Sequence, residues 1–136
     1  MMGNRENSFE LRLKNAEGIP VLRLAGNVSS TALKAVTFTL DKLVRAGHFN
    51  VILNIEQVSG ANLRLLNKLS DSLTKFRQHH GIVELVAAGD RIPELLKTEK
   101  LKKLFRISRS EKQAISRIKR LARWPESVVE TDARLT

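Results

Sequence analysis

The sequence predicts an α/β domain with a mixed, mostly parallel sheet of about five strands, an N-terminal β-hairpin and four helices. Two short strand-like segments at residues 9–14 and 21–25 flank a turn, which predicts the hairpin. Apolar runs at 51–55 and 82–86 then alternate with helical segments. Strands that alternate with helices favour parallel pairing with right-handed crossovers. The 136 residues, 42% of them hydrophobic, are enough for one core.

The first helix follows the hairpin. Residues 9–14 alternate apolar and polar side chains, as a half-buried strand does. Ser29, Ser30 and Thr31 offer hydroxyls that can cap a helix N-terminus. Apolar residues then recur at spacings of three and four, which predicts an amphipathic helix that ends at Ala46 and Gly47. These apolar residues are Leu33, Val36, Leu40 and Leu43.

The middle of the chain predicts a central strand, a loop and a long helix. Residues 51–55 are mostly apolar, as in a strand that is covered on both faces. Residues 56–61 read as a loop, and Asn62 opens the second helix as its expected N-cap. The core-facing stripe of that helix consists of Leu66, Leu69, Leu73 and Phe76.

The last third predicts a short helix, a weak strand and a final helix. Residues 92–96 form the short helix, with proline in its first turn. Residues 104–107 form the strand. Ser110 caps the final helix and Pro125 stops it, with Trp124 covering its end. We expect a domain over residues 9–122, flanked by flexible tails at 1–8 and 123–136.

Composition excludes several classes of function. The chain has no cysteine, so disulfides and thiolate chemistry are excluded. No segment approaches the length of a membrane span, and the polar N-terminus lacks the apolar core of a secretory signal. The sequence has no nucleophile motif, no phosphate-binding glycine loop and no usefully paired carboxylates. We therefore expect a cytoplasmic protein that is not an enzyme and uses no metal or cofactor.

Positive charge is concentrated late in the chain. The formal net charge is +10, and residues 91–124 carry 12 Lys and Arg against 3 Asp and Glu. Such a segment attracts an acidic protein partner or an anionic membrane surface, or is simply a solvated face. Nucleic-acid binding is not expected, because only Phe105 and Trp124 supply aromatic rings there.

Three segments together resemble the STAS domain, the fold of bacterial anti-sigma factor antagonists. Residues 18–26 resemble the second strand of that domain and the glycine that follows it. Residues 51–69 resemble its central strand, switch loop and second helix. Residues 86–105 resemble its end segment. The resemblance spans about residues 9–122. It implies a protein-interaction module that binds an anti-sigma factor, commonly a serine kinase, and so regulates sigma-factor-dependent transcription.

The family's phosphorylation motif is altered in this chain. The switch loop of the family usually ends Asp-Ser-Ser/Thr-Gly-Leu, and its first serine is phosphorylated. In the ungapped register Asn62 falls on the aspartate, Leu63 on that serine and Arg64 on the next hydroxyl. A second register matches Ser59 and Gly60 to Ser-Gly, and makes Ser59 a candidate phosphosite. We prefer the first register, in which leucine cannot accept phosphate.

The resemblance also implies where a partner docks. We expect the surface to join residues 27–30, residues 59–63 and the helix face from Arg64. Its candidate partner-binding residues are Asn27, Ser29, Ser30, Ser59, Gly60, Asn62, Leu63 and Arg64. Leu63 is either an exposed docking anchor or a first-turn core residue. Ser59 either contacts the partner or only stabilises a turn. Asn62 caps the second helix, contacts the partner, or does both.

A different class of function stays open. STAS-like domains also serve as cytoplasmic subunits of transporters, including lipid-trafficking ABC systems. A missing phosphosite and a basic last third suit that role near anionic lipid. A stress-signalling scaffold is a third alternative.

Overall fold

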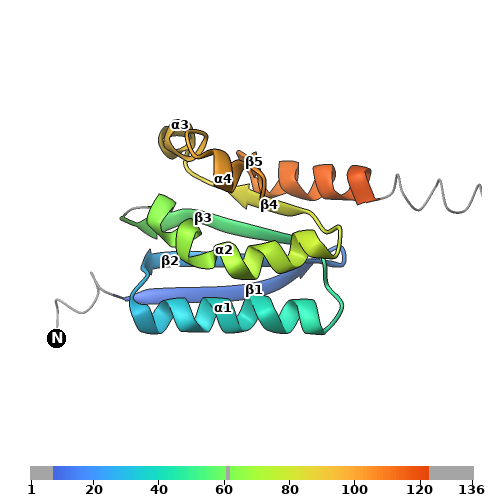
Figure 1. Ribbon diagram of the computed structural model, residues 1–136, viewed down its shortest axis with the longest axis horizontal. Helices are drawn as coiled ribbons and strands as arrows, with labels where there is room; N and C mark the ends of the chain where they lie inside the picture. Colours follow the sequence, from blue (N-terminus) through green and yellow to red (C-terminus); the bar gives the residue numbers. More distant parts are fainter. Residues whose placement is uncertain (1–7, 61, 123–136) are drawn as a thin grey trace, which may run out of the picture.

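A computed structural model describes residues 8–60 and 62–122 of the chain. It contains a five-stranded sheet in the order β1-β2-β3-β4-β5 (Figure 1). Strands β1 and β2 form the predicted antiparallel hairpin, and the other neighbours pair in parallel. The strands are β1 (Phe9–Ala16), β2 (Ile19–Asn27), β3 (Val51–Ser59), β4 (Val83–Val86) and β5 (Arg106–Ser108). The predicted α/β class with a mixed, mostly parallel sheet is confirmed.

Helices lie on both faces of this sheet. The first face is covered by α1 (Ser30–Arg45) and α2 (Asn62–Gln78), which run side by side in Figure 1. A 3-10 turn η2 (Gly89–Arg91) and two short helices, α3 (Ile92–Leu95) and α4 (Glu99–Lys102), connect β4 to β5. A final helix over residues 111–122 packs against the second face.

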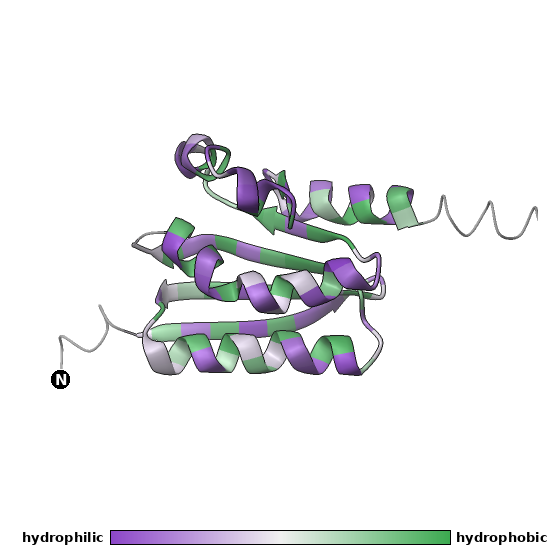
Figure 2. Ribbon diagram, viewed as in Figure 1, coloured by the Kyte–Doolittle hydropathy of each residue, from purple (hydrophilic) through white to green (hydrophobic). Residues whose placement is uncertain are grey.

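Two hydrophobic clusters hold these layers together, because successive strand residues face opposite sides. Leu53 belongs to the cluster beneath α1 and α2, whereas its neighbour Ile52 packs beneath the final helix with Ala114 and Ile118. The first cluster contains the predicted stripes of both long helices. Figure 2 shows β4 almost wholly apolar and β1 alternating between polar and apolar residues, as expected for a covered strand and a half-covered one.

Several predicted boundaries were wrong, among them those of β2, which was expected at 21–25 and runs over Ile19–Asn27. Residues 56–59 belong to β3 and not to a loop, because pairing with β2 continues past an irregularity to the partners Asn27 and Ser59. The short helix expected at 92–96 is present as α3 (Ile92–Leu95), and the turn η2 before it was not predicted. A further helix, α4, follows α3. Its Leu101 side chain is buried, and this burial stabilises the helix against the core. Strand β5 begins at Arg106 and not at residue 104.

Two predicted caps are present. The Ser29 hydroxyl accepts a hydrogen bond of 3.2 Å from the Ala32 amide at the start of α1. The Ser110 hydroxyl accepts one of 3.1 Å from the Gln113 amide, while the Gln113 side chain accepts one of 2.8 Å from the Arg109 amide. This reciprocal pair satisfies two amides at the start of the final helix.

Several expectations concern residues outside the described part of the chain. They are the tails at 1–7 and 123–136, the stop at Pro125 and the cover supplied by Trp124. Asn62 begins α2 as expected, but its side chain is outside the described structure, so its capping role stays a prediction. Within residues 8–60 and 62–122, no helix combines the length and the apolar character needed to cross a membrane.

Candidate docking surface

The ends of β2 and β3 lie side by side because these strands pair in parallel. Asn27, the last residue of β2, is the register partner of Ser59, the last residue of β3. Each strand then leads within a few residues into a helix, α1 or α2. The two helices therefore begin at the same edge of the sheet (Figure 1). Free backbone N–H groups at helix N-termini give this edge a partial positive charge.

A cavity of about 370 Å³ lies between these two strand ends and the two helix starts. It brings together residues that are about 30 positions apart in the sequence. The described residues that line it are Asn27, Val28, Ser29, Ser30, Leu33, Val58, Ser59, Gly60, Arg64, Leu65 and Lys68. Val58 and Leu65 are buried and give it an apolar floor, whereas the serine and basic residues are exposed at its rim.

Backbone geometry fixes both loops at this cavity. Gly26 has a φ of +89°, and a Cβ there would lie 2.1 Å from the Ser8 carbonyl oxygen. Only glycine fits this position. Gly60 also has a positive φ, of +85°, and its carbonyl oxygen accepts a hydrogen bond from the Arg91 guanidinium. The loop after β3 is thereby tied to the η2 turn, which holds the rim of the cavity in place.

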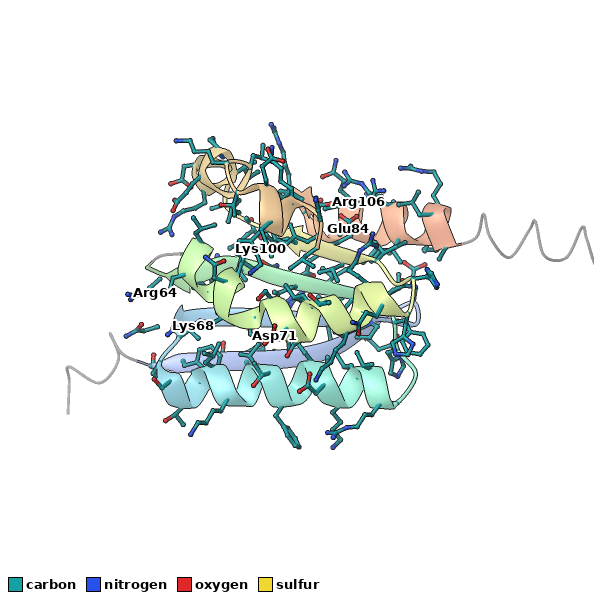
Figure 3. All side chains as sticks on the ribbon, in the orientation of Figure 1. Arg64, Lys68, Asp71, Glu84, Lys100 and Arg106 are labelled. Carbon is teal, nitrogen blue, oxygen red and sulfur yellow. The ribbon has the colours of Figure 1, made fainter. Side chains whose placement is uncertain are left out.

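The cavity has a positive electrostatic character. Arg64 and Lys68 are exposed and lie one turn apart at the start of α2, on the same side of the molecule (Figure 3). None of the described residues that line the cavity is acidic. Two helix N-termini and two cations together favour an acidic group on whatever occupies the site.

Six of the eight predicted docking residues line this cavity: Asn27, Ser29, Ser30, Ser59, Gly60 and Arg64. Leu63 does not, because its side chain is half-buried and packs against the main core. Of the two roles that the sequence left open, exposed docking anchor or first-turn core residue, this packing is closer to the second. The Ser29 hydroxyl is engaged as the α1 cap, so Ser30 and Ser59 are the more available hydroxyls.

Sequence reasoning missed Lys68 and, in the apolar floor, Val58. Lys68 follows Arg64 by four residues on a predicted helix, and this spacing alone places both side chains on one face. Val58 could not be found, because residue 58 was assigned to a loop. Its burial follows from the extra length of β3.

In the part of the chain that the structure describes, no three His, Asp or Glu residues gather closely enough to hold a metal ion.

Comparison with solved structures identifies the fold. An anti-sigma factor antagonist from Mycobacterium paratuberculosis matches with a TM-score of 0.69 at 16% identity, over 83% of this chain and 96% of that chain. The Bacillus cell fate determinant SpoIIAA in its phosphorylated form matches with a TM-score of 0.62 at 16% identity, over 82% and 99%. A STAS domain protein from Planctomyces limnophilus matches with a TM-score of 0.59 at 12% identity, over 78% and 96%.

These likenesses, at 12–16% identity, show the fold. The protein has the fold of the STAS domain, and neighbours that share it are described as anti-sigma factor antagonists, SpoIIAA in its unphosphorylated form among them. The fold that the sequence resemblance implied is therefore confirmed. Protein-family models give no match to the sequence, and no curated protein matches it.

Proposed function

We propose that the protein is an anti-sigma factor antagonist that works as a non-enzymatic binding module. It docks on an anti-sigma factor of the serine-kinase type and so frees a sigma factor for transcription. The observation that carries this proposal is the cavity at the ends of β2 and β3, which gathers six of the eight predicted docking residues. The structural neighbours that are described as anti-sigma factor antagonists add support.

In the proposed complex, apolar and charged groups of the cavity have different roles. The floor formed by Val58, Leu65 and the half-buried Leu33 offers apolar area to an inserted side chain. Arg64 and Lys68 at the rim attract an acidic surface, and such charges set association rate and partner choice more than affinity. The exposed Ser30 and Ser59 hydroxyls can orient the partner by hydrogen bonds.

The complex proposed here is not controlled by phosphate at the usual position. In the ungapped register that position is Leu63, which has no oxygen to receive a phosphoryl group. Its half-buried side chain packs against the core, which supports a constant rather than a switched surface. Ser59 is exposed at the end of β3 and is the candidate phosphosite in the alternative register. Any ATP site belongs to the partner.

Charge reversal at the rim tests the proposal. The variant R64E/K68E places two carboxylates at the cavity and should weaken capture of the anti-sigma factor by about tenfold or more. The matched control K112E/R120E reverses two exposed charges on the final helix, on the other face of the sheet. It should bind as the unaltered protein does. Equal binding by R64E/K68E in a purified two-protein titration would contradict the proposal.

A second candidate function is a cytoplasmic subunit of a transporter, such as a lipid-trafficking ABC system. It is favoured by a group of exposed cationic side chains with no ion-pair partner among the described residues. They include Lys97, Lys100, Lys103, Arg106 and Arg109. They suit an anionic membrane surface. Neighbouring genes separate the two: a kinase or sigma factor favours the antagonist, and transporter subunits favour the alternative.

A further inference from the structure

A second cavity lies far from the docking surface, where α2 ends and β4 and β5 begin. Its volume is about 460 Å³. Three separate parts of the chain line it: the end of α2, the start of β4, and the segment from α4 into β5. The described lining residues are Arg77, Ile82, Val83, Lys102, Lys103, Leu104, Phe105 and Arg106.

Four of these residues are cationic, and none of the described lining residues is acidic. Arg77 is held in place, because its guanidinium donates a hydrogen bond of 2.6 Å to the Gly81 carbonyl oxygen. Lys102 has a partial partner in Glu99, at 3.3 Å, whose side chain is 84% exposed. Lys103 and Arg106 are exposed and have no hydrogen-bond or ion-pair partner for their side chains among the described residues.

Like charges that share one cavity repel each other unless an anion lies between them. Helix ends explain part of the arrangement, since Arg77 is in the last turn of α2 and Lys102 in that of α4, where cations are favoured. They do not explain Arg106, which is the first residue of a strand. Residues from three elements thus supply more positive charge than local structure requires.

We propose that this cavity binds a phosphate group that carries at least two negative charges, either a phosphate monoester or a pyrophosphate. Guanidinium groups and lysine ammonium groups are the side chains that bind such oxygens, and two arginines and two lysines meet here. No acidic residue of the described lining would repel the phosphate. Ile82, Val83 and Leu104 add an apolar wall for the organic part of the ligand.

The bound phosphate group can belong either to a free phosphate compound or to a lipid headgroup. Two probes distinguish them. Pyrophosphate is titrated at constant ionic strength while backbone amide resonances of residues 77 and 102–106 are followed by NMR. Vesicles of phosphatidylcholine that contain phosphatidic acid, a monoester, are compared with vesicles that contain phosphatidylglycerol, a diester of lower charge.

The variant K103Q/R106Q removes two cations from the cavity, and K112Q/R120Q removes two exposed cations from the final helix as the matched control. Thermal melts check that both variants are folded. We expect saturable pyrophosphate binding that falls by about tenfold in K103Q/R106Q, since hydrogen bonds to charged groups account for such a factor. The control should change it by less than about twofold, because it removes only long-range charge.

The outcomes of these titrations distinguish a free phosphate ligand, a lipid headgroup and the absence of a phosphate site. Binding of pyrophosphate that depends on Lys103 and Arg106 supports a free phosphate ligand. Binding only to phosphatidic acid vesicles, with the same dependence, supports a lipid headgroup. The proposal is overturned if both variants weaken binding equally, if phosphatidylglycerol binds as well as phosphatidic acid, or if neither probe gives saturable binding. Those results would mean that the cations only raise the net charge.

Discussion

The guanidinium of Arg23 in β2 donates two parallel hydrogen bonds, each of 2.7 Å, to the carboxylate of Glu111 in the final helix. Asn54 of β3 donates a third, also of 2.7 Å, to the same carboxylate. These contacts join the first turn of the final helix to strands that precede it by 88 and 57 residues. They attach the helix to the sheet face opposite α1 and α2.

The hydrogen bonds from Arg23, with the one from Asn54 and the charges of Arg23 and Lys14, lower the pKa of Glu111 to about 2, although burial opposes the shift. A lowered pKa contributes stability that is complete above the unfolded value of 4.5 and is lost as pH falls toward 2. Because Arg23 is 43% exposed, we expect the loss to be about 1–2 kcal/mol.

Urea titrations at a series of pH values measure this loss. The variant E111Q should be less stable than the unaltered protein at neutral pH, and the difference should shrink between pH 4.5 and 2. The control E10Q removes an exposed carboxylate that pairs with Arg12 at 3.2 Å. It should leave the pH dependence unchanged. A stability difference for E111Q that is constant across this range contradicts the assignment.

Glu84 presents a different electrostatic problem, because it is fully buried in β4. One carboxylate oxygen accepts a hydrogen bond of 2.5 Å from the Ser108 hydroxyl and lies 3.4 Å from the Arg117 guanidinium. The other oxygen has no protein partner in the described structure. Removal of Arg117 would leave a buried carboxylate without a cation, which is costly.

We therefore expect R117A to destabilise the protein by about 2–3 kcal/mol, somewhat less than a fully buried pair because Arg117 is 24% exposed. The double variant E84Q/R117A should recover part of this loss, since no charge then remains buried. K119A is the control. It breaks the exposed ion pair with Glu17 and should cost less than about 1 kcal/mol. Additive effects of E84Q and R117A in urea unfolding would rule out the coupling.

The fold could be predicted because its signals are local. The alternation in β1, the stripes of α1 and α2 and the caps at Ser29 and Ser110 each depend on residues a few positions apart. The length of β3 could not be predicted in this way. Glu56 and Gln57 are exposed polar residues, and only pairing with β2 keeps them in a strand.

The docking surface was predicted only in outline, because part of it depends on contacts between distant residues. The resemblance gave the two loops, but the cavity between them depends on the β2–β3 register, which no local pattern contains. The second cavity was outside the reach of sequence reasoning. Arg77 and Arg106 are 29 positions apart, and the basic segment alone did not indicate that a residue of α2 would join it.

The phosphorylation state tests the preferred register. The protein is incubated with a serine-kinase anti-sigma factor and ATP, and its peptides are examined by mass spectrometry. We expect no phosphate at residues 59–65, because Leu63 has no hydroxyl and Ser59 is interpreted as a docking residue. A standard substrate of the same kinase serves as the positive control. Stoichiometric phosphate on Ser59 would establish the alternative register and restore a switch to the cavity rim.

Gly81 precedes β4 and lies against the backbone of two other segments. A Cβ at this position would lie 1.6 Å from the Phe49 carbonyl oxygen and 2.8 Å from that of Phe76. Neither oxygen can move freely, because each belongs to the main chain beside a packed element. We expect G81A to lower the free energy of unfolding by about 3 kcal/mol or more, measured in urea.

Gly89, at the start of η2, provides the matched control for this substitution. A Cβ there would meet nothing within 4 Å, so G89A should change stability by less than about 1 kcal/mol. The same chemical change thus separates steric conflict from the general effect of replacing glycine. If G81A and G89A lowered the free energy of unfolding in urea equally, the close approach of Phe49 to the turn before β4 would be wrong. The placement of β4 beside β3 would then need revision.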